Sequence, residues 1–304
     1  MPATLSPAPE APGRGEPVAI IMRSKNEQPY AERTLEALRS QTVQHFTLYN
    51  VDSGSTDGTL EVVKRFNPRA DLVTEIAPSS YIPGRVLNTM ISAAPERIVV
   101  LLNADCVPQD AFWLERLLEP LYRGEADGVT SRQVARPDAH FVVKYDLDRV
   151  YGPANRGKTG HSFFSAAACA FKRGLWEGQK FPEEGWGEDF VWAVACKAAG
   201  ARFAIAVESV VEHSHNYTLK TLYRRERGHG MVYFQVLGEP PAPVREGIAC
   251  ARHMVRDVLY ALRHGRPDTI PFNLAYRAVF NYAHFSGRRA AAKRQGFPQE
   301  FFRD

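Results

Sequence analysis

Short β-branched runs alternate with amphipathic stretches over the first half of the chain, and this pattern constrains the fold more than any other feature of the sequence. The expected strands are Val18–Met22, Phe46–Val51, Leu72–Ile76 and Arg97–Leu102. The expected helices between them are Tyr30–Ser40, Thr59–Phe66 and Gly84–Ala94. Strands and helices that alternate in this order are typical of βαβ units. We therefore predict an α/β fold with a Rossmann-like, mainly parallel central sheet flanked by helices.

The second half of the chain has a different pattern. Strand-like segments cover Gly128–Val134 and Phe163–Phe171, and a helix is expected over Glu188–Ala199. From residue 218 onward the sequence is mostly helical, with prolines at 240 and 243 between successive helices. The sequence therefore predicts three parts: a flexible tail over residues 1–17, an α/β domain over residues 18–217, and a C-terminal helical extension over residues 218–304.

The charge and cysteine content exclude several classes of protein. The 38 lysine and arginine residues against 34 acidic residues give a net charge of +4, which is too small for a dedicated nucleic-acid binder. The four cysteines include no Cys-x-x-Cys pair, so we expect no zinc knuckle or disulfide framework, and a cytoplasmic location fits best. The N-terminal tail lacks the basic start and apolar stretch of a signal peptide. No apolar run approaches the roughly 20 residues that span a bilayer, so any membrane contact is expected to be peripheral, at the inner face.

Polar residues directly follow the second and fourth expected strands, whose carboxyl ends meet at the edge where open α/β sheets bind ligands. Asp52 follows the second strand, where its carboxylate can accept hydrogen bonds from a base or a ribose. A helix cap explains Ser55–Asp57 equally well but does not explain Asp52. Asp105 follows the fourth strand, and a carboxylate there suits Mg²⁺ or Mn²⁺. The alternative for Asp105 is the N-cap of a helix that begins soon after Pro108.

Two later segments carry further candidates. Glu188 and Asp189 stand at the start of an expected helix, where a carboxylate can take a proton from an acceptor hydroxyl, although acidic residues are also common at helix starts for structural reasons. His213 and His215 point the same way if their segment is extended, so either imidazole is a candidate to complete the coordination of a cation at Asp105.

Taken together and in this order, these segments resemble the family 2 glycosyltransferases of GT-A fold, and the resemblance covers roughly residues 18–230. It implies that residues 18–217 bind a nucleotide-diphosphate sugar and transfer the sugar to an acceptor hydroxyl. In this family the exit of the first strand and the VDSGSTDGT segment hold the nucleotide, and Tyr81–Asn88 is similar to the family's Gly-x-x-x-Asn helix start. The donor contacts implied by the resemblance are Arg23, Glu27, Asp52, Arg85, Asn88, Asn103, Ala104 and Trp186.

The resemblance also assigns the chemistry. Asn103-Ala-Asp105 is similar to the family's Asp-x-Asp motif with its first acid replaced by asparagine, which leaves Asp105 as the main carboxylate ligand of Mg²⁺ or Mn²⁺. His213 matches the histidine that often completes the metal site. Asp189 matches the general base of the inverting members, with Glu188 beside it as a second catalytic candidate.

A narrower resemblance concerns the segment His213–Lys220 and the Tyr-Arg-Arg that follows at residues 223–225, which are similar to bacterial rhamnosyltransferases that build surface polysaccharides. It implies a UDP- or dTDP-sugar donor, with dTDP-rhamnose among the options, and a saccharide or lipid-linked acceptor. A homodimer and peripheral membrane contact are the further partners compatible with the sequence, and no nucleic acid is expected. Arg224, Arg225 and His229 are candidates for diphosphate contacts, with a solvated helix face as the alternative.

Two other functions are compatible with parts of this sequence. A sugar nucleotidyltransferase would share the fold, but it needs a glycine-rich phosphate loop after the first strand, and Arg23–Glu27 contains no glycine. A non-enzymatic module that binds nucleotide or carbohydrate gains support from Asn103. The four residues Asp105, Glu188, Asp189 and His213 favour an enzyme, because a binding module has little need for all of them.

Overall fold

The computed structural model describes residues 13–67, 69–155, 164–185 and 187–293, which divide into two compact units. The first unit contains the described residues up to Val134, together with Val150–Glu184 and Glu188–His213. The second contains Ala135–Arg149, Gly185–Gly187 and the described residues from Ser214 onward. The division thus falls between His213 and Ser214, and it joins Ala135–Arg149 to the C-terminal unit. The three-part division at residues 17 and 217 stays a prediction.

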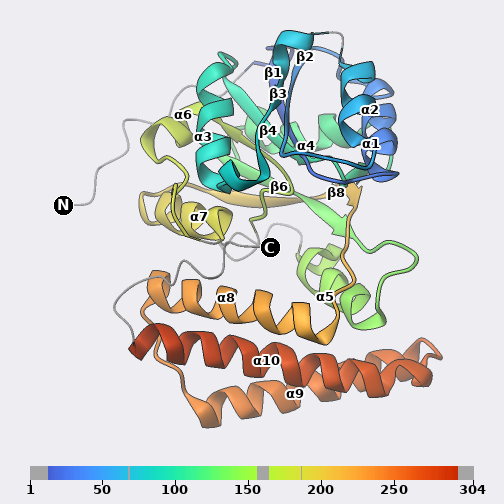
Figure 1. Cartoon of the computed structure of the whole chain (residues 1–304), viewed down its shortest axis with the longest axis vertical. Helices are drawn as coiled ribbons and strands as arrows, with labels where there is room; N and C mark the ends of the chain where they lie inside the picture. The colour runs from blue at the N-terminus through green and yellow to red at the C-terminus, as the bar shows by residue number, and fades with distance from the viewer. Residues whose placement is uncertain (1–12, 68, 156–163, 186, 294–304) are drawn as a thin grey trace. The chain divides into compact units, whose positions relative to one another are not determined.

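The described residues of the first unit form an eight-stranded sheet with the order β3-β2-β1-β4-β7-β6-β8-β5 (Figure 1). The strands are β1 (Val18–Ser24), β2 (Phe46–Asp52), β3 (Val73–Glu75), β4 (Ile98–Asn103), β5 (Val107–Pro108), β6 (Gly128–Val134), β7 (Ala168–Lys172) and β8 (Phe203–Glu212). Strand β1 pairs in parallel with β2 and β4, β2 with β3, and β6 with β8. Strand β7 lies antiparallel between β4 and β6, and β5 pairs antiparallel with β8.

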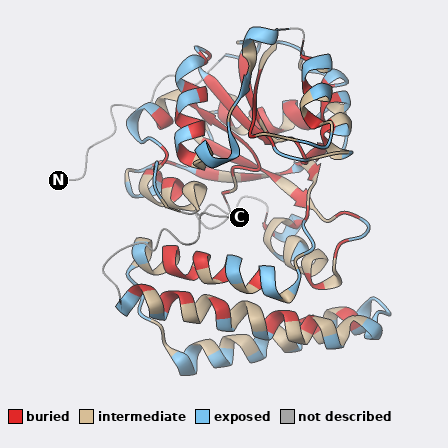
Figure 2. Ribbon diagram, in the orientation of Figure 1, coloured by how far each residue is buried: buried red, intermediate tan, exposed pale blue. Residues whose placement is uncertain are grey.

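Helices cover both faces of this sheet. They are α1 (Tyr30–Arg39), α2 (Thr59–Phe66), α3 (Pro83–Ala93), α4 (Trp113–Tyr122), α6 (Arg173–Gly178) and α7 (Glu188–Ala198). Short 3₁₀ turns are η1 (Ala70–Leu72), η2 (Pro78–Ser80) and η3 (Pro153–Asn155). Side chains alternate along each central strand, so Val99 of β4 packs on one face and Val100 on the other. Both faces are therefore buried, which is typical of parallel strands and explains the continuous apolar run of β4 (Figure 2).

The predicted α/β fold, with a central sheet flanked by helices and helices at the C-terminus, is confirmed. Three details of the prediction were wrong. The third strand is shorter than expected, because residues 70–72 form the turn η1. The strand expected from residue 163 begins at Ala168. The segment after Asp105 forms the short strand β5, and α4 begins only at Trp113, so Asp105 does not cap that helix.

The second unit is helical. Its helices are α5 (Phe141–Tyr151, whose last two residues belong to the first unit), α8 (Leu219–Leu237), α9 (Pro243–Arg263) and α10 (Ile270–Lys293), with the turn η5 (Pro267–Thr269) before α10. Helix α10 lies between α8 and α9 (Figure 1). Gly230 and Gly287 permit the close approach of α8 and α10, because a Cβ atom at either position would collide with a backbone carbonyl of the other helix. No helix in the described part of the chain is long and apolar enough to cross a membrane.

Candidate active site

The loop after β4 lies at the exit of the neighbouring strand β1. The backbone N–H of Ala104 donates to the carbonyl of Arg23 at 2.8 Å, and that of Asn103 donates to the carbonyl of Ala167 at 2.8 Å. These bonds continue the pairing of β4 with β1 and with β7 by one residue each, since Arg23 is the register partner of Asn103 and Ala167 directly precedes β7. The side chains at residues 103–105 are therefore fixed where the strand ends converge.

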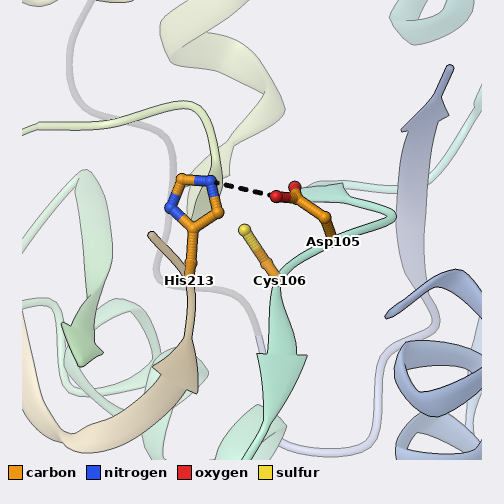
Figure 3. A group of neighbouring side chains, drawn as sticks. All are labelled: Asp105, Cys106 and His213. Atoms are coloured by element: carbon orange, nitrogen blue, oxygen red, sulfur yellow. Dashed lines mark ion pairs between the residues drawn. The ribbon is translucent and has the colours of Figure 1, made fainter. Parts of the chain in front are cut away.

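Three potential metal ligands meet next to this loop (Figure 3). Asp105, Cys106 and His213 each offer an atom within 4.8 Å of the others. Asp105 Oδ2 lies 3.5 Å from His213 Nε2, and Asp105 is only 2% exposed. Figure 3 shows the Cys106 thiol pointing toward the space between the other two side chains. His215 is exposed and is not part of this group, so of the two histidines it is His213 that lies beside Asp105.

Gln133 fixes the orientation of the His213 ring. The Nδ1 atom lies 2.8 Å from Gln133 Oε1, and because an amide oxygen only accepts, Nδ1 must carry the proton. Nε2, the atom that faces Asp105, is then the nitrogen that offers a lone pair when the ring is neutral. Gln133 Nε2 donates in turn to the Tyr151 hydroxyl at 3.2 Å. A carboxylate and an imidazole whose second nitrogen donates to a fixed acceptor are the arrangement found around bound divalent cations, so these residues fit a metal ion.

Arg23 connects the strand exits with the first turn of α7. Its Nη2 and Nε donate to Asn103 Oδ1 at 2.9 and 3.2 Å, and its Nη1 lies 3.3 Å from Glu188 Oε1. Burial alone would lower the pKa of Arg23, but the charges of Tyr81, Glu188 and Asp189 outweigh it and raise the pKa. Arg23 is therefore a fixed positive charge between the Asn103 loop and the acidic pair.

The two acidic residues at the start of α7 have different surroundings. Burial, followed by the charge of Asp189, raises the pKa of Glu188, although its ion pair with Arg23 acts in the opposite direction. Asp189 Oδ2 accepts a hydrogen bond from the backbone N–H of Ala166 at 3.2 Å. Glu188 is thus engaged with Arg23. Asp189 is held by a backbone amide and forms no ion pair with a cationic side chain among the described residues, which leaves it the better placed of the two to accept a proton.

Asp52 is occupied by its own loop. Its Oδ1 accepts from the backbone N–H groups of Gly54 and Ser55, and its Oδ2 accepts from the hydroxyls of Ser24 and Ser55 at 2.7 and 2.6 Å. Gly54 has a φ of 84°, a conformation that glycine adopts without strain. Asp52 thus shapes the turn after β2. The sequence did not predict this structural role. Its contact with a nucleotide stays a prediction.

The remaining predicted donor contacts are dispersed. Asn88 is buried and bonds Phe181 and Trp176, so it attaches α3 to the segment before α7. Arg85 is exposed and lies 3.7 Å from Glu183. The backbone N–H of Glu27 donates to Thr59 Oγ1 at 2.9 Å. Ala104 is fully buried and contributes through its backbone. Trp186 lies outside the described residues.

Three residues of the site were missed by the sequence interpretation. Cys106 could have been noticed because it directly follows Asp105. Gln133 and Tyr151 gave no signal, since each is one polar residue in an ordinary strand or helix pattern. Burial, followed by the charge of Asp189, raises the pKa of Tyr151, so the Gln133–Tyr151 pair connects the surroundings of His213 with those of the acidic pair.

Comparisons with known proteins identify the family of the chain. The model of glycosyl transferase family 2 matches residues 19–177, about half of the chain. The O-antigen chain rhamnosyltransferase WbaN of Salmonella anatum is 28% identical over 201 residues, a match that covers 62% of this chain and 63% of WbaN. The O-antigen chain rhamnosyltransferase RfbN of Salmonella typhimurium is 24% identical over 220 residues, a match that covers 68% of this chain and 69% of RfbN. The match therefore spans somewhat less than two thirds of the length of WbaN.

Solved structures show the same fold. The mannosyltransferase PcManGT of Pyrobaculum calidifontis, in complex with GDP-Man and Mn²⁺, has a TM-score of 0.58 at 23% identity, over 92% of this chain and 76% of that one. TarS of S. aureus in complex with UDP-GlcNAc has a TM-score of 0.50 at 14% identity, over 91% of each chain. These likenesses establish the GT-A fold for this chain.

Proposed function

This chain belongs to glycosyl transferase family 2, and on that premise we propose that it transfers a sugar from a nucleotide-diphosphate donor to an acceptor hydroxyl, with inversion at the anomeric carbon. The donor is a UDP- or dTDP-sugar, with dTDP-rhamnose as the first candidate because both Salmonella relatives are O-antigen chain rhamnosyltransferases. The acceptor is a saccharide or a lipid-linked saccharide. The free cysteines in the structure are compatible with the cytoplasm as its compartment.

One observation carries this proposal: four segments far apart in the sequence meet at the carboxyl ends of β1 and β4. Arg23 contacts both Asn103 and Glu188, and Asp105 lies 3.5 Å from His213. A pure binding module has no need for a carboxylate–imidazole pair beside a second acidic pair. A transferase needs both, because it must stabilise a leaving diphosphate and accept a proton.

Each residue then has a task. Asp105 and His213, with Cys106 beside them, would hold Mg²⁺ or Mn²⁺, and PcManGT was solved with Mn²⁺. Such a cation, when bound, neutralises charge that develops on the leaving diphosphate. Asp189 accepts the proton of the acceptor hydroxyl as its oxygen bonds to the anomeric carbon and the bond from that carbon to the diphosphate oxygen breaks. Arg23 keeps Glu188 and Asn103 in place around this centre.

The test of this assignment is the Asp189→Asn variant. Asparagine keeps the size of the side chain but cannot take a proton, so transfer should fall by about 10²- to 10⁴-fold while donor binding is retained. The measurement combines single-turnover transfer from dTDP-rhamnose and from UDP-sugars with donor affinity by calorimetry.

The matched control is Asp71→Asn, which removes an exposed carboxylate paired only with Arg69. It should leave both transfer and affinity unchanged. Normal transfer by Asp189→Asn would refute the general-base role. Absence of transfer by the native chain from every sugar nucleotide, despite binding, would favour the non-enzymatic alternative.

A further inference from the structure

Helix α9 exposes a row of large apolar side chains. Of the seven exposed large hydrophobic residues in the described part of the chain, five lie on this one helix. They are Val244, Ile248, Val255, Leu259 and Leu262. Scattered exposed hydrophobic residues are normal on a protein surface, but a concentration of this kind marks an interaction site.

The five side chains form one continuous stripe. Their spacings of four, seven, four and three residues place them on one face of an α-helix. The opposite face of α9 contains the buried residues Asp257 and Ala261, and Asp257 is bound by Arg277 of α10. The packing against α10 therefore uses the other side of the helix. Figure 2 shows the exposed positions along α9.

A row of arginines runs beside the apolar stripe. Arg245, Arg252, Arg256 and Arg263 are all exposed, and they stand one residue after Val244, Ala251, Val255 and Leu262. One residue corresponds to about 100° around the helix, so the four guanidinium groups share one flank of the stripe. Arg252, Arg256 and Arg263 form no ion pair with any described residue, and Arg245 lies 3.3 Å from Glu239.

The carboxylates of α9 are turned away from this face. The helix contains two, Glu246 and Asp257. Glu246 pairs with Arg288 at 3.0 Å and Asp257 with Arg277 at 2.8 Å, both on α10. The outer face of α9 is therefore apolar and positively charged, and neither carboxylate of the helix itself lies on it.

We propose that this face of α9 docks the protein onto an anionic phospholipid surface. An exposed amphipathic helix with an apolar stripe and arginines on its polar side is suited to lie in the interface, with the stripe among the acyl chains and the guanidinium groups among the phosphates. Charge complementarity selects this occupant over a second copy of the chain, because an antiparallel α9 pair would place the arginine rows of the two copies against one another. This inference does not depend on the transfer chemistry.

The experiment is co-sedimentation of the full chain with sucrose-loaded vesicles, either of phosphatidylcholine alone or with about one third phosphatidylglycerol. We expect binding to the anionic vesicles that weakens as salt is added, and little binding to the neutral ones. The variant Ile248→Ser/Val255→Ser/Leu259→Ser should lose at least about tenfold in partition coefficient, because the insertion of the stripe is removed. The variant Arg252→Gln/Arg256→Gln/Arg263→Gln should lose the preference for anionic vesicles.

Two control variants test whether vesicle binding depends on the exposed face of α9 or only on the hydrophobic content and net charge of the chain. Phe112→Ser/Tyr282→Ser removes the other two exposed large hydrophobic residues, and Arg97→Gln/Arg116→Gln/Arg123→Gln makes the same change in net charge on the first unit. Both should bind vesicles like the native chain. The proposal is overturned if the native chain does not bind anionic vesicles, or if the α9 variants bind as well as it does. It is also overturned if sedimentation velocity shows that the stripe holds a dimer that does not bind vesicles.

Discussion

At the scale of single residues, the partners of a side chain decide which of its atoms is offered for chemistry. His213 would be free to present either ring nitrogen if nothing contacted it. Gln133 accepts from Nδ1 and so leaves Nε2 toward Asp105. Arg23 acts in a similar way on the acidic pair, because its ion pair with Glu188 leaves Asp189 as the carboxylate with only neutral donors.

The Gln133→Ala variant should weaken metal binding. Without the amide oxygen, the His213 ring loses its fixed proton and orientation, and the affinity for Mn²⁺ should fall about 10- to 100-fold. Calorimetric titration of Mn²⁺ into the native chain and the variant measures the change. Gln133→Glu retains an acceptor and should restore most of the affinity. Equal affinity in native chain and Gln133→Ala would show that the hydrogen bond from His213 to Gln133 does not support metal binding.

At the scale of elements, contacts at strand and helix ends keep the layers of the fold in register. Asp127 immediately precedes β6, and its carboxylate accepts from Lys172 at the end of β7 at 2.9 Å and from the backbone N–H of Arg202, just before β8, at 3.0 Å. One side chain thus joins the ends of three neighbouring strands. In the helical unit, Gly230 and Gly287 allow α8 and α10 to pack closely, because neither has a side chain that would hold the two helices apart.

The Asp127→Asn variant is predicted to lose stability in a pH-dependent way. Burial alone would raise the pKa of Asp127, but the hydrogen bonds from Lys172 and Arg202 outweigh it and lower the pKa below its ordinary 3.8. A lowered pKa stabilises the fold above the pKa of the unfolded chain, and this stability is lost as pH falls through the folded value. The variant should therefore be about 1–2 kcal/mol less stable near neutral pH, with a smaller difference as the pH approaches 3.

Urea denaturation of the native chain and this variant over that pH range gives the two curves. Asp268→Asn is the control, because Asp268 forms a fully exposed pair with Arg266 and should contribute little at any pH. A constant difference between native chain and Asp127→Asn at all pH values would contradict the assigned titration.

The Gly230→Ala variant is predicted to destabilise the helical unit. The added methyl group would collide with the carbonyl of His284, so α8 and α10 must separate, at a cost of about 1–3 kcal/mol. Gly247→Ala is the matched control. Its methyl group would meet open space on α9, and replacing a helical glycine there should stabilise by about 0.5–1 kcal/mol. Thermal melts that rank the two variants in the opposite order would refute the close approach of α8 and α10.

At the scale of the whole molecule, the two units carry different features. The first holds the converging strand ends with Asp105, His213 and Asp189, and the second carries the exposed face of α9. Donor binding and surface binding should therefore be separable by mutation. Variants of the α9 face are expected to bind nucleotide normally, and variants of Asp105 are expected to bind vesicles normally.

Ligand addition to the whole chain should raise its melting temperature in a metal-dependent way. A ligand that binds only the folded state at about 100 times its Kd stabilises it by about 2.7 kcal/mol. We expect this shift with one nucleotide class among UDP, dTDP, GDP and CDP in the presence of Mn²⁺ or Mg²⁺, and its loss with EDTA or in Asp105→Asn. A shift of the same size in EDTA would show that donor binding does not require a metal ion.

The sequence by itself determined most elements of the first half of the chain and the order of the motifs. Its hydrophobic periodicity fixed the helix Thr59–Phe66 and the strand Gly128–Val134 to the residue, because such periodicity depends on neighbours within a few positions. The order of the motifs indicated the family, which the match over residues 19–177 confirms. The roles of the site residues, from Arg23 to His213, remain predictions.

The tertiary structure decided which side chains meet. Gln133 and His213 are 80 residues apart and touch only because β6 and β8 are neighbours in parallel register. Periodicity tells which face of a strand is buried but not which strand lies beside it, so no local pattern could reveal this pair. The same holds for Asp52, whose carboxylate is enclosed by its own turn and by Ser24 of the adjacent strand. Strand order and register are properties of the packed sheet, and together with the packing of α7 they bring the distant residues of this site together.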